Sequence, residues 1–179
     1  QSSFPGGGQE VVQAAFQEVL RSRPQRVFLP LQTEEVTEIL EFMEAEGLAV
    51  GLLGTDSWDT AVLQEHPATR DAFVAHQWMW TMPDSTTQAF SHRYTEAHGD
   101  PPRSTAALSY DAVHILASAA TASGSLDGRA LREAITRLPA YQGVSGLIHF
   151  DGSNDPSRPV VISRIVDGQA TFVTSVDVG

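Results

Sequence analysis

The fold is decided by residues 26–58, which read RVFLPLQTEEVTEILEFMEAEGLAVGLLGTDSW. Two short apolar runs, at 26–31 and at 48–53, predict buried strands. Between them the chain predicts a helix that begins with Thr33 as its cap and ends at Gly47. Its apolar residues recur at helical spacing: Val36, Ile39, Leu40 and Met43. Because such strand–helix–strand units are right-handed in nearly all proteins, the two strands are expected to be parallel.

Polar residues follow both predicted strands. Parallel strands end at the same edge of a sheet, and open α/β sheets bind ligands in the crevice beyond the carboxyl ends of their strands. Gln32 follows the first strand, and Asp56, Ser57 and Trp58 follow the second. We therefore expect these side chains to form a ligand-binding site.

The composition predicts a folded protein that does not bind polyanions. The 179 residues include 11 basic and 22 acidic side chains, a net charge of −11 that repels nucleic acid and anionic membranes. No apolar run approaches the ~20 residues that span a bilayer. The lack of cysteine excludes disulfides, cysteine-based zinc sites and thiol catalysis. Residues 1–5 do not resemble a signal sequence, and without an initiator Met the chain is expected to be processed or partial.

The rest of the chain predicts an α/β fold, with a parallel sheet, flanking helices and a carboxyl-terminal antiparallel hairpin. The hairpin is predicted by the tight-turn pair Asp167-Gly168. A predicted strand at 73–82 would place Trp78 and Trp80 on one face, where core packing is the more ordinary role. The remaining predicted elements are helices at 9–23, 85–98, 104–122 and after Asp127, and strands at 145–150, 160–166 and 170–176.

No other motif points to catalysis or to a cofactor. The six histidines show no metal-site spacing, and Gly6-Gly7-Gly8 lacks the Lys-Ser/Thr of a phosphate-binding loop. Tyr110 and Asp111 are expected to pack and to bond a neighbouring loop. Ser145 is not followed by the strand-to-helix turn of a nucleophile elbow. We therefore expect no enzyme activity, no metal and no cofactor.

The order of motifs along the chain resembles one family. FSHRYTEAHGDPP at 90–102 and SYDAV at 109–113 are similar to the F…Y…yG…P…YDA stretch of type I periplasmic solute-binding proteins. Within that family the chain is most similar to the branched-chain amino acid and amide receptors of ABC importers. Further similarities cover practically the whole chain: 27–31, EGL at 46–48, 53–58, LDG at 126–128, YQGVSG at 141–146, IHFD at 148–151 and VDG at 166–168.

This resemblance implies a two-lobed protein that binds a small polar ligand, amino acid-like or amide-like, in the cleft between its lobes. Residues 1–82 would belong to the second lobe and 83–142 to the first. Residues 143–179 would form the crossover and the β-hairpin. The protein would be the periplasmic or extracytoplasmic component of an ABC importer, with the transporter's membrane subunits as partners and with no nucleic acid partner.

One departure from the family concerns length. The chain is about half as long as is usual, and the amino-terminal half, which supplies most of the first lobe's sheet, is the part without a counterpart. The predicted helix at 104–122 is nearly uncharged and apolar on most of its circumference, as in helices buried against a sheet. Without that sheet it would expose an apolar face. A companion chain, self-association or a rearrangement is expected to cover this face.

The resemblance also suggests a role for each candidate residue. Gln32 and Asp56 match positions that face the ligand, and an acid at the second position often pairs with a ligand ammonium through a charge-assisted bond. Alternatively, Asp56 caps the turn that follows it and Gln32 is only solvated. Trp58 would form an apolar wall of the pocket, or else pack its loop onto the domain. Ser57 is less specific, because small hydroxyl residues occur in any tight loop.

Three other functions remain open. The same fold serves as a sensory or regulatory module, in which ligand closure signals to a partner. An enzyme at the same sheet edge would need a paired acid and base, whereas only Asp56 immediately follows a predicted strand there. A half-length chain could also be a non-binding fragment or an assembly unit.

Overall fold

The computed structural model describes residues 9–138, 140–150, 152 and 155–177. Contacts divide the chain into two compact units. Unit 1 comprises the residues up to Ala75 together with Ile162–Val173, and unit 2 comprises His76–Val161 together with the residues from Thr174. The chain therefore passes from one unit to the other three times. The assignment of 1–82, 83–142 and 143–179 to the lobes of the family remains a prediction.

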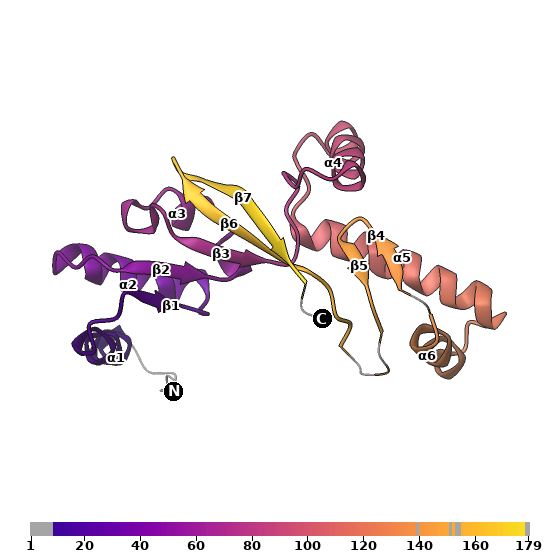
Figure 1. The fold of residues 1–179 in the computed structure, drawn as a ribbon, viewed down its shortest axis with the longest axis horizontal. Coiled ribbons are helices and arrows are strands. Elements are labelled where there is room, and N and C mark those ends of the chain that lie inside the picture. The colour runs from indigo at the N-terminus through magenta and orange to yellow at the C-terminus, as the bar shows by residue number, and fades with distance from the viewer. Residues whose placement is uncertain (1–8, 139, 151, 153–154, 178–179) are drawn as a thin grey trace. The chain divides into compact units, whose positions relative to one another are not determined.

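Unit 1 is built on a sheet in which three parallel strands are followed by an antiparallel pair (Figure 1). The strand order is β1-β2-β3-β6-β7. Ile165 near the end of β6 exchanges hydrogen bonds with the residues just before β3, so β6 runs opposite to β3. The strands are β1 at Arg26–Phe28, β2 at Gly51–Gly54, β3 at Phe73–His76, β6 at Val160–Val166 and β7 at Gln169–Val176.

The helix between the first two strands carries the core of unit 1. Helix α2 spans Thr33–Ala45, and α1, which spans Gln9–Arg21, packs against it. The predicted apolar stripe of α2 is buried, together with residues from all three parallel strands, in one cluster that also includes Phe16, Leu52, Trp58 and Val74. The chain leaves α2 through Gly47, which has a φ of +62° and suits the expected glycine at this end.

The carboxyl-terminal hairpin is confirmed. Asp167 and Gly168 connect β6 to β7 with φ values of +49° and +77°. Two consecutive positive φ values define the turn whose twist matches that of paired antiparallel strands. Arg164 on β6 donates to Asp71 at 2.8 Å and so ties the hairpin to the loop before β3.

The described part of unit 2 contains three helices and a two-stranded antiparallel sheet. Its core is a small cluster formed by Trp78, Phe90, Ala107 and Val144. The elements are α4 at Ser85–His98, α5 at Ser104–Ser123, α6 at Gly128–Thr136, β4 at Tyr141–Gly143 and β5 at Gly146–Ile148. The predicted helices at 85–98 and 104–122 are confirmed to within one residue.

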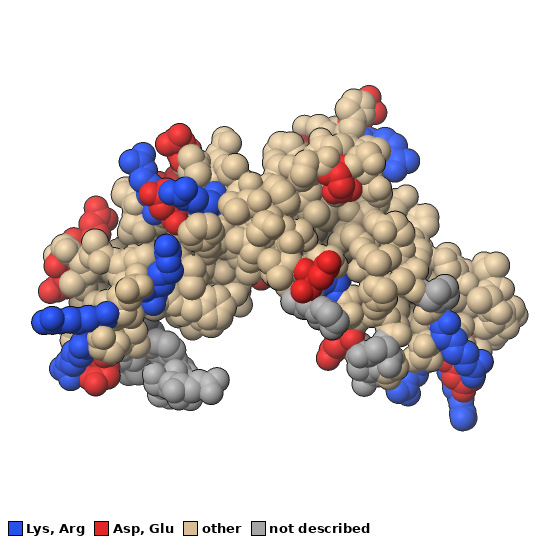
Figure 2. All heavy atoms as spheres, viewed as in Figure 1, with Lys and Arg blue, Asp and Glu red and all other residues tan. Residues whose placement is uncertain are grey.

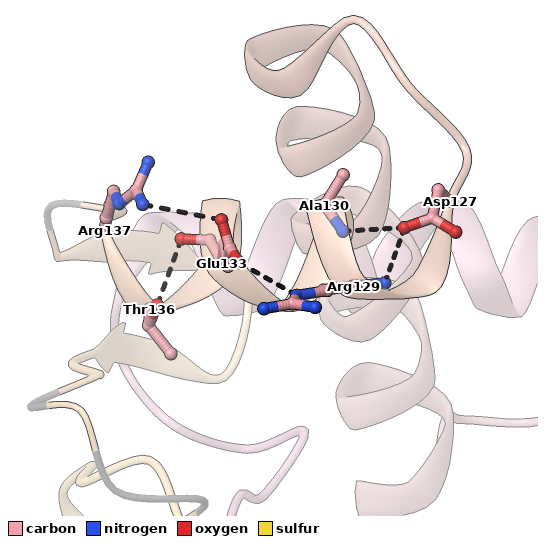
Figure 3. Close-up of polar contacts among 6 residues, drawn as sticks. All are labelled: Asp127, Arg129, Ala130, Glu133, Thr136 and Arg137. Carbon is pink, nitrogen blue, oxygen red and sulfur yellow. Dashed lines mark hydrogen bonds and ion pairs between the residues drawn. The ribbon is translucent and has the colours of Figure 1, made fainter.

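Aspartate side chains cap the starts of α4 and α6, as expected. Asp84 accepts a hydrogen bond from the Thr87 amide at the start of α4, and Gly99 ends that helix with a φ of +87°. Asp127 accepts from the amides of Arg129 and Ala130 at the start of α6 (Figure 3). These caps satisfy amide groups that have no partner within the helix.

The predicted strand at 73–82 is wrong beyond His76. The chain leaves the sheet there, and the Trp78 indole donates to Thr87 Oγ1 at 3.1 Å while its ring packs edge-on against Phe90. Trp78 is buried, as the packing interpretation expected, whereas Trp80 is 47% exposed. The two rings therefore do not share the face that a continuous strand would give them.

The strand predicted at 145–150 is shorter than expected, and its partner was missed. Only Gly146–Ile148 form β5, and it pairs with β4, in which Tyr141 lies opposite Ile148. Asp111 of α5 holds the turn between the two strands. Its carboxylate accepts hydrogen bonds from the amides of Val144 and Ser145 at 2.8 Å and from the Ser145 hydroxyl at 2.5 Å.

Candidate functional site

The tips that follow β1 and β2 lie together, as the parallel arrangement predicts. The Leu29 amide donates to the Leu53 carbonyl, which extends the ladder past the last residue of β1. Beyond it, Ser57 Oγ donates to the Leu31 carbonyl at 2.7 Å, and Thr33 Oγ1 donates to the Ser57 carbonyl at 3.0 Å. These two bonds join the loops that carry Gln32 and Asp56.

Gln32 is exposed and caps α2, a position predicted for Thr33. Its backbone amide donates to the Glu35 carboxylate at 3.0 Å. Thr33 is instead the first helical residue, and its hydroxyl bonds across to the neighbouring tip, as described above. The expected cap was wrong because this cross-tip bond is not visible in the local sequence.

Asp56 begins a short 3-10 turn, Asp56–Trp58, and its side chain is exposed. Among the described residues no hydrogen bond or ion pair engages its carboxylate, and the cap of the turn is Thr55. Asp59, Glu34 and Glu35 on the same two tips are also exposed, and residues 31–35 and 55–60 contain no basic side chain. This edge therefore presents an acidic surface that suits a cationic group.

Trp58 is fully buried in the core of unit 1. Its ring lies so close to Gly54 that a Cβ at that position would overlap it, so β2 must end in glycine there. Its indole Nε1 has no hydrogen-bond partner among the described residues. The packing alternative for Trp58 thus has direct structural support, and its contact with a ligand remains a prediction.

Ser57 contributes more to this edge than the sequence suggested. Its hydroxyl bonds the Leu31 carbonyl and lies 3.0 Å from Thr55 Oγ1, and its carbonyl accepts from Thr33. Sequence reasoning did not single out Thr33 and Thr55 as members of this network. The only signal that could have found them is that hydroxyl residues occur on both tips.

The other chemically suggestive residues lie in unit 2 and serve its structure. Asp111 bonds the β4–β5 turn, as its packing interpretation expected. Tyr110 is 37% exposed rather than buried, and its ring packs in tilted contact with Phe90 and with His114. The pKa of the Tyr141 phenol is raised above its ordinary value, first because of partial burial and then because of the charges of Asp111 and Tyr110.

The described part of the chain shows neither a metal site nor a membrane-spanning helix. It contains no group of three or more His, Cys, Asp or Glu side chains that could hold a metal ion. It also contains no helix that is both long and apolar enough to cross a membrane. In the view of Figure 2, acidic and basic side chains are scattered in small groups rather than gathered into a single basic patch.

Solved structures share the fold of this chain. It matches a leucine-binding protein from Thermotoga maritima with a TM-score of 0.84 and 23% identity, covering 98% of this chain and 51% of that one. It matches an ABC transporter substrate-binding protein from Desulfitobacterium hafniense, solved with leucine, with a TM-score of 0.75 and 27% identity, covering 94% and 49%. A solute-binding protein from R. palustris in complex with benzoate matches with a TM-score of 0.73 and 17% identity, covering 97% and 48%.

The chain thus spans about half the length of the structures that it matches. These relatives are named as binding proteins, not as enzymes. No curated protein sequence matches the chain. The sequence pattern of a family described as periplasmic binding protein matches residues 3–170, which is most of the chain. The chain, with its parallel sheet, flanking helices and antiparallel hairpin, belongs to the periplasmic binding protein family.

Proposed function

We propose that this chain is part of the solute-binding component of an ABC importer. Family membership and the names of the matched structures support a role in binding. The same description supports a periplasmic or extracytoplasmic location and the membrane subunits of the transporter as partners. The ligand would be small and polar, amino acid-like or amide-like, and would be held at the carboxyl edge of β1 and β2 as a second lobe closes over it.

The observation that carries this proposal is the free carboxylate of Asp56. The loop that carries it is fixed by Ser57, which bonds the neighbouring tip, and by Trp58, which anchors it in the core. A carboxylate held in this way loses little conformational entropy when it pairs with an ammonium group. Gln32, exposed on the adjoining tip, would supply a donor and an acceptor to the same ligand.

The charges at this edge favour the amino group of the ligand over its carboxylate. The amino end of α2 is the positive end of a helix dipole and by itself would attract an anion. Glu34 and Glu35 occupy that first turn, and Glu35 already accepts from the Gln32 amide. An anionic ligand group would meet these acids and Asp56, whereas an ammonium would be attracted by them.

The test is a titration of the ¹⁵N-labelled chain with L-leucine, followed by NMR. The amide signals of residues 31–33 and 55–58 should shift, and Asp56→Asn should weaken binding by roughly ten- to a hundredfold, since a charged hydrogen bond contributes about 1.5–3 kcal/mol. Asp59→Asn removes the same charge from the same loop, but the Asp59 carboxylate already accepts a hydrogen bond from Gln64, so this substitution should weaken binding much less than Asp56→Asn does.

A second ligand, which lacks the ammonium group, distinguishes a direct pair between Asp56 and the ammonium from the effect of the overall charge of the protein. 4-Methylpentanoate is leucine without its ammonium, so it should bind more weakly than leucine, and Asp56→Asn should not weaken it further. If Asp56→Asn and Asp59→Asn weakened leucine binding equally, the effect of Asp56 would be explained by the change in net charge alone. Leucine-dependent shifts confined to unit 2 would remove the binding site from this edge.

A sensory or regulatory module with the same fold remains the second candidate. Such a module would bind its ligand at the same site, but the closed form would signal to a regulatory partner instead of delivering the ligand to a transporter. No feature of the described residues favours it over transport. Gene context would separate the two, because genes for transporter subunits beside this one would support import.

A further inference from the structure

Strand β7 is the last strand of the five-stranded sheet, and no strand of the described residues pairs with its outer side. The strand at the other edge is β1, which has three residues and includes Arg26. In contrast, β7 has eight residues, QATFVTSV, with no charged residue and no proline. Proteins commonly protect an exposed edge with a short strand, with charged side chains or with proline. Because β7 has none of these, its edge is open to another strand.

The hairpin turn determines which residues of β7 direct their backbone groups outward. Asp167 and Gly168 form a two-residue turn, and the residues that flank such a turn bond to each other. Bonded and non-bonded positions then alternate along the strand. The residues whose N–H and C=O groups point away from β6 are therefore Ala170, Phe172, Thr174 and Val176. Another extended backbone matches groups that are spaced in this way.

The side chains of β7 allow an identical strand to approach. Val173 is 48% and Val176 47% exposed, and neither carries a charge. The nearest acids in the sequence are Asp167 in the turn, whose carboxylate lies 3.7 Å from Arg70, and Asp177 directly after the strand. Two identical antiparallel strands are related by a two-fold axis, so one contact closes both open edges at once.

We infer that β7 pairs antiparallel with β7 of a second copy of the chain, with Val173 on the two-fold axis. This register uses the whole strand, whereas registers centred nearer either end pair fewer residues. A register centred on Phe172 would bring Asp167 close to Asp177 of the second copy, and like charges opposite each other are destabilising.

The register centred on Val173 avoids this repulsion. It sets Gln169, which can donate a hydrogen bond, opposite Asp177 of the second copy. It also pairs the hydroxyl residues Thr171 and Ser175, a favourable cross-strand combination. The contact includes no residue of α5 and none of the candidate ligand site. It therefore does not depend on the proposed function, and either proposal can fail alone.

The net charge of the chain makes this dimer weak and dependent on salt. Each copy carries a charge of −11, so the two copies repel each other as a whole. One pair of strands also buries less area than a standard interface, so we expect dimers at about 10⁻⁴–10⁻³ M protein. Salt screens the repulsion between the copies, so dimerisation should strengthen severalfold when salt is raised.

Disulfide cross-linking tests the register, because the chain has no cysteine of its own. Val173→Cys places two thiols opposite each other at a non-bonded pair, within the reach of a disulfide. Thr171→Cys places them about 13 Å apart along the strands, beyond that reach. Phe28→Cys is the control at the other edge of the sheet, where Phe28 is 56% exposed. Under mild oxidation the Val173→Cys variant should form covalent dimers about ten times faster than either other variant. Equal rates for all three variants would overturn the inference.

Sedimentation equilibrium at low and high salt tests the contact without a thiol. Val173→Lys sets two ammonium groups opposite each other at the axis and should leave the protein monomeric. Phe28→Lys changes the net charge by the same amount at the other edge and should dimerise as the wild type does. A wild-type chain that stays monomeric at high salt would overturn the inference. Undiminished dimers of the Val173→Lys variant would also overturn it, because the copies would then meet through another surface.

Discussion

At the scale of single residues, buried polar groups in this protein hold loops in place. The Asp111 carboxylate accepts three hydrogen bonds from the β4–β5 turn, and it lies against Gly143, where a Cβ would overlap its oxygens. Ser57 has the same function in unit 1, where it joins the tips after β1 and β2. In both cases a residue whose type also suggests catalysis forms hydrogen bonds that hold a neighbouring loop, which gives it a structural role.

The pKa of the Tyr141 phenol depends on its burial and on the charge of Asp111. Burial and this neighbouring carboxylate raise the pKa of the phenol in the folded protein. The unfolded chain therefore releases this proton at lower pH than the folded chain does. The stabilisation is complete below the unfolded-state pKa of about 10 and is lost as the pH rises through the folded-state value.

The free energy of unfolding should therefore fall less at high pH in Tyr141→Phe than in the wild type. The difference in the free energy of unfolding between wild type and variant should be constant from pH 7 to 9, and above about pH 10 it should shift in favour of the variant. Urea denaturation across this range measures it. In an Asp111→Asn background the shift should shrink. A difference that does not vary up to pH 11 would contradict the raised pKa.

At the scale of elements, helices were predicted more accurately than strands. The ends of α4 and α5 follow from local signals, namely the cap Asp84 and the left-handed glycines Gly99 and Gly124. Strand ends depend on distant partners. The end of β3 is set where Trp78 turns to pack on Phe90 and Thr87, and the sequence of residues 77–82 contains no sign of this. Strand β4 was missed because its turn is held by a residue more than 30 positions earlier.

The candidate site was predictable in its position but not in its bonding. Right-handed crossover connections place the tips after β1 and β2 at one edge from sequence alone. Which side chains point outward depends on packing: Trp58 turns inward onto Gly54, whereas Asp56 remains exposed. Both occur within one three-residue turn, and residue type does not distinguish the two directions.

Helix α6 allows a cap to be compared with ion pairs on the same element. Asp127 bonds two backbone amides, whereas Glu133 forms exposed pairs with Arg129 at 3.4 Å and Arg137 at 3.5 Å (Figure 3). Asp127→Ala should cost about 1 kcal/mol of unfolding free energy. Glu133→Ala should cost about 0.3 kcal/mol, and this cost should disappear in 1 M salt, because exposed pairs are screened. If Glu133→Ala lowered the free energy of unfolding by the same amount at low and at high salt, its effect would not come from screened ion pairs.

At the scale of the whole molecule, the chain contains two cores of different size. Unit 1 has a continuous cluster that includes residues from α1, α2 and all three parallel strands. Unit 2 has a small cluster around Trp78, and much of its longest helix is exposed. Because apolar burial provides most of the driving force for folding, unit 2 is expected to be the less stable of the two.

Two substitutions should separate the units in thermal unfolding. Gly54→Ala forces a Cβ against the fully buried Trp58 ring, and such overpacking costs about 1–3 kcal/mol in unit 1. Asp111→Asn replaces one carboxylate acceptor by an amide donor that faces the donors of the β4–β5 turn, a loss of about 2 kcal/mol in unit 2. Calorimetry should show two transitions, with Asp111→Asn lowering only the earlier one and Gly54→Ala only the later one.

Hydrogen exchange followed by mass spectrometry assigns these transitions to parts of the chain. Gly54→Ala should speed exchange in 26–54 and leave 104–148 unchanged, and Asp111→Asn should do the reverse, since each unit encloses its own core. Asp100→Asn, an exposed acid in unit 2, should change neither region. A single transition lowered by both substitutions would mean that the two units fold as one cooperative structure.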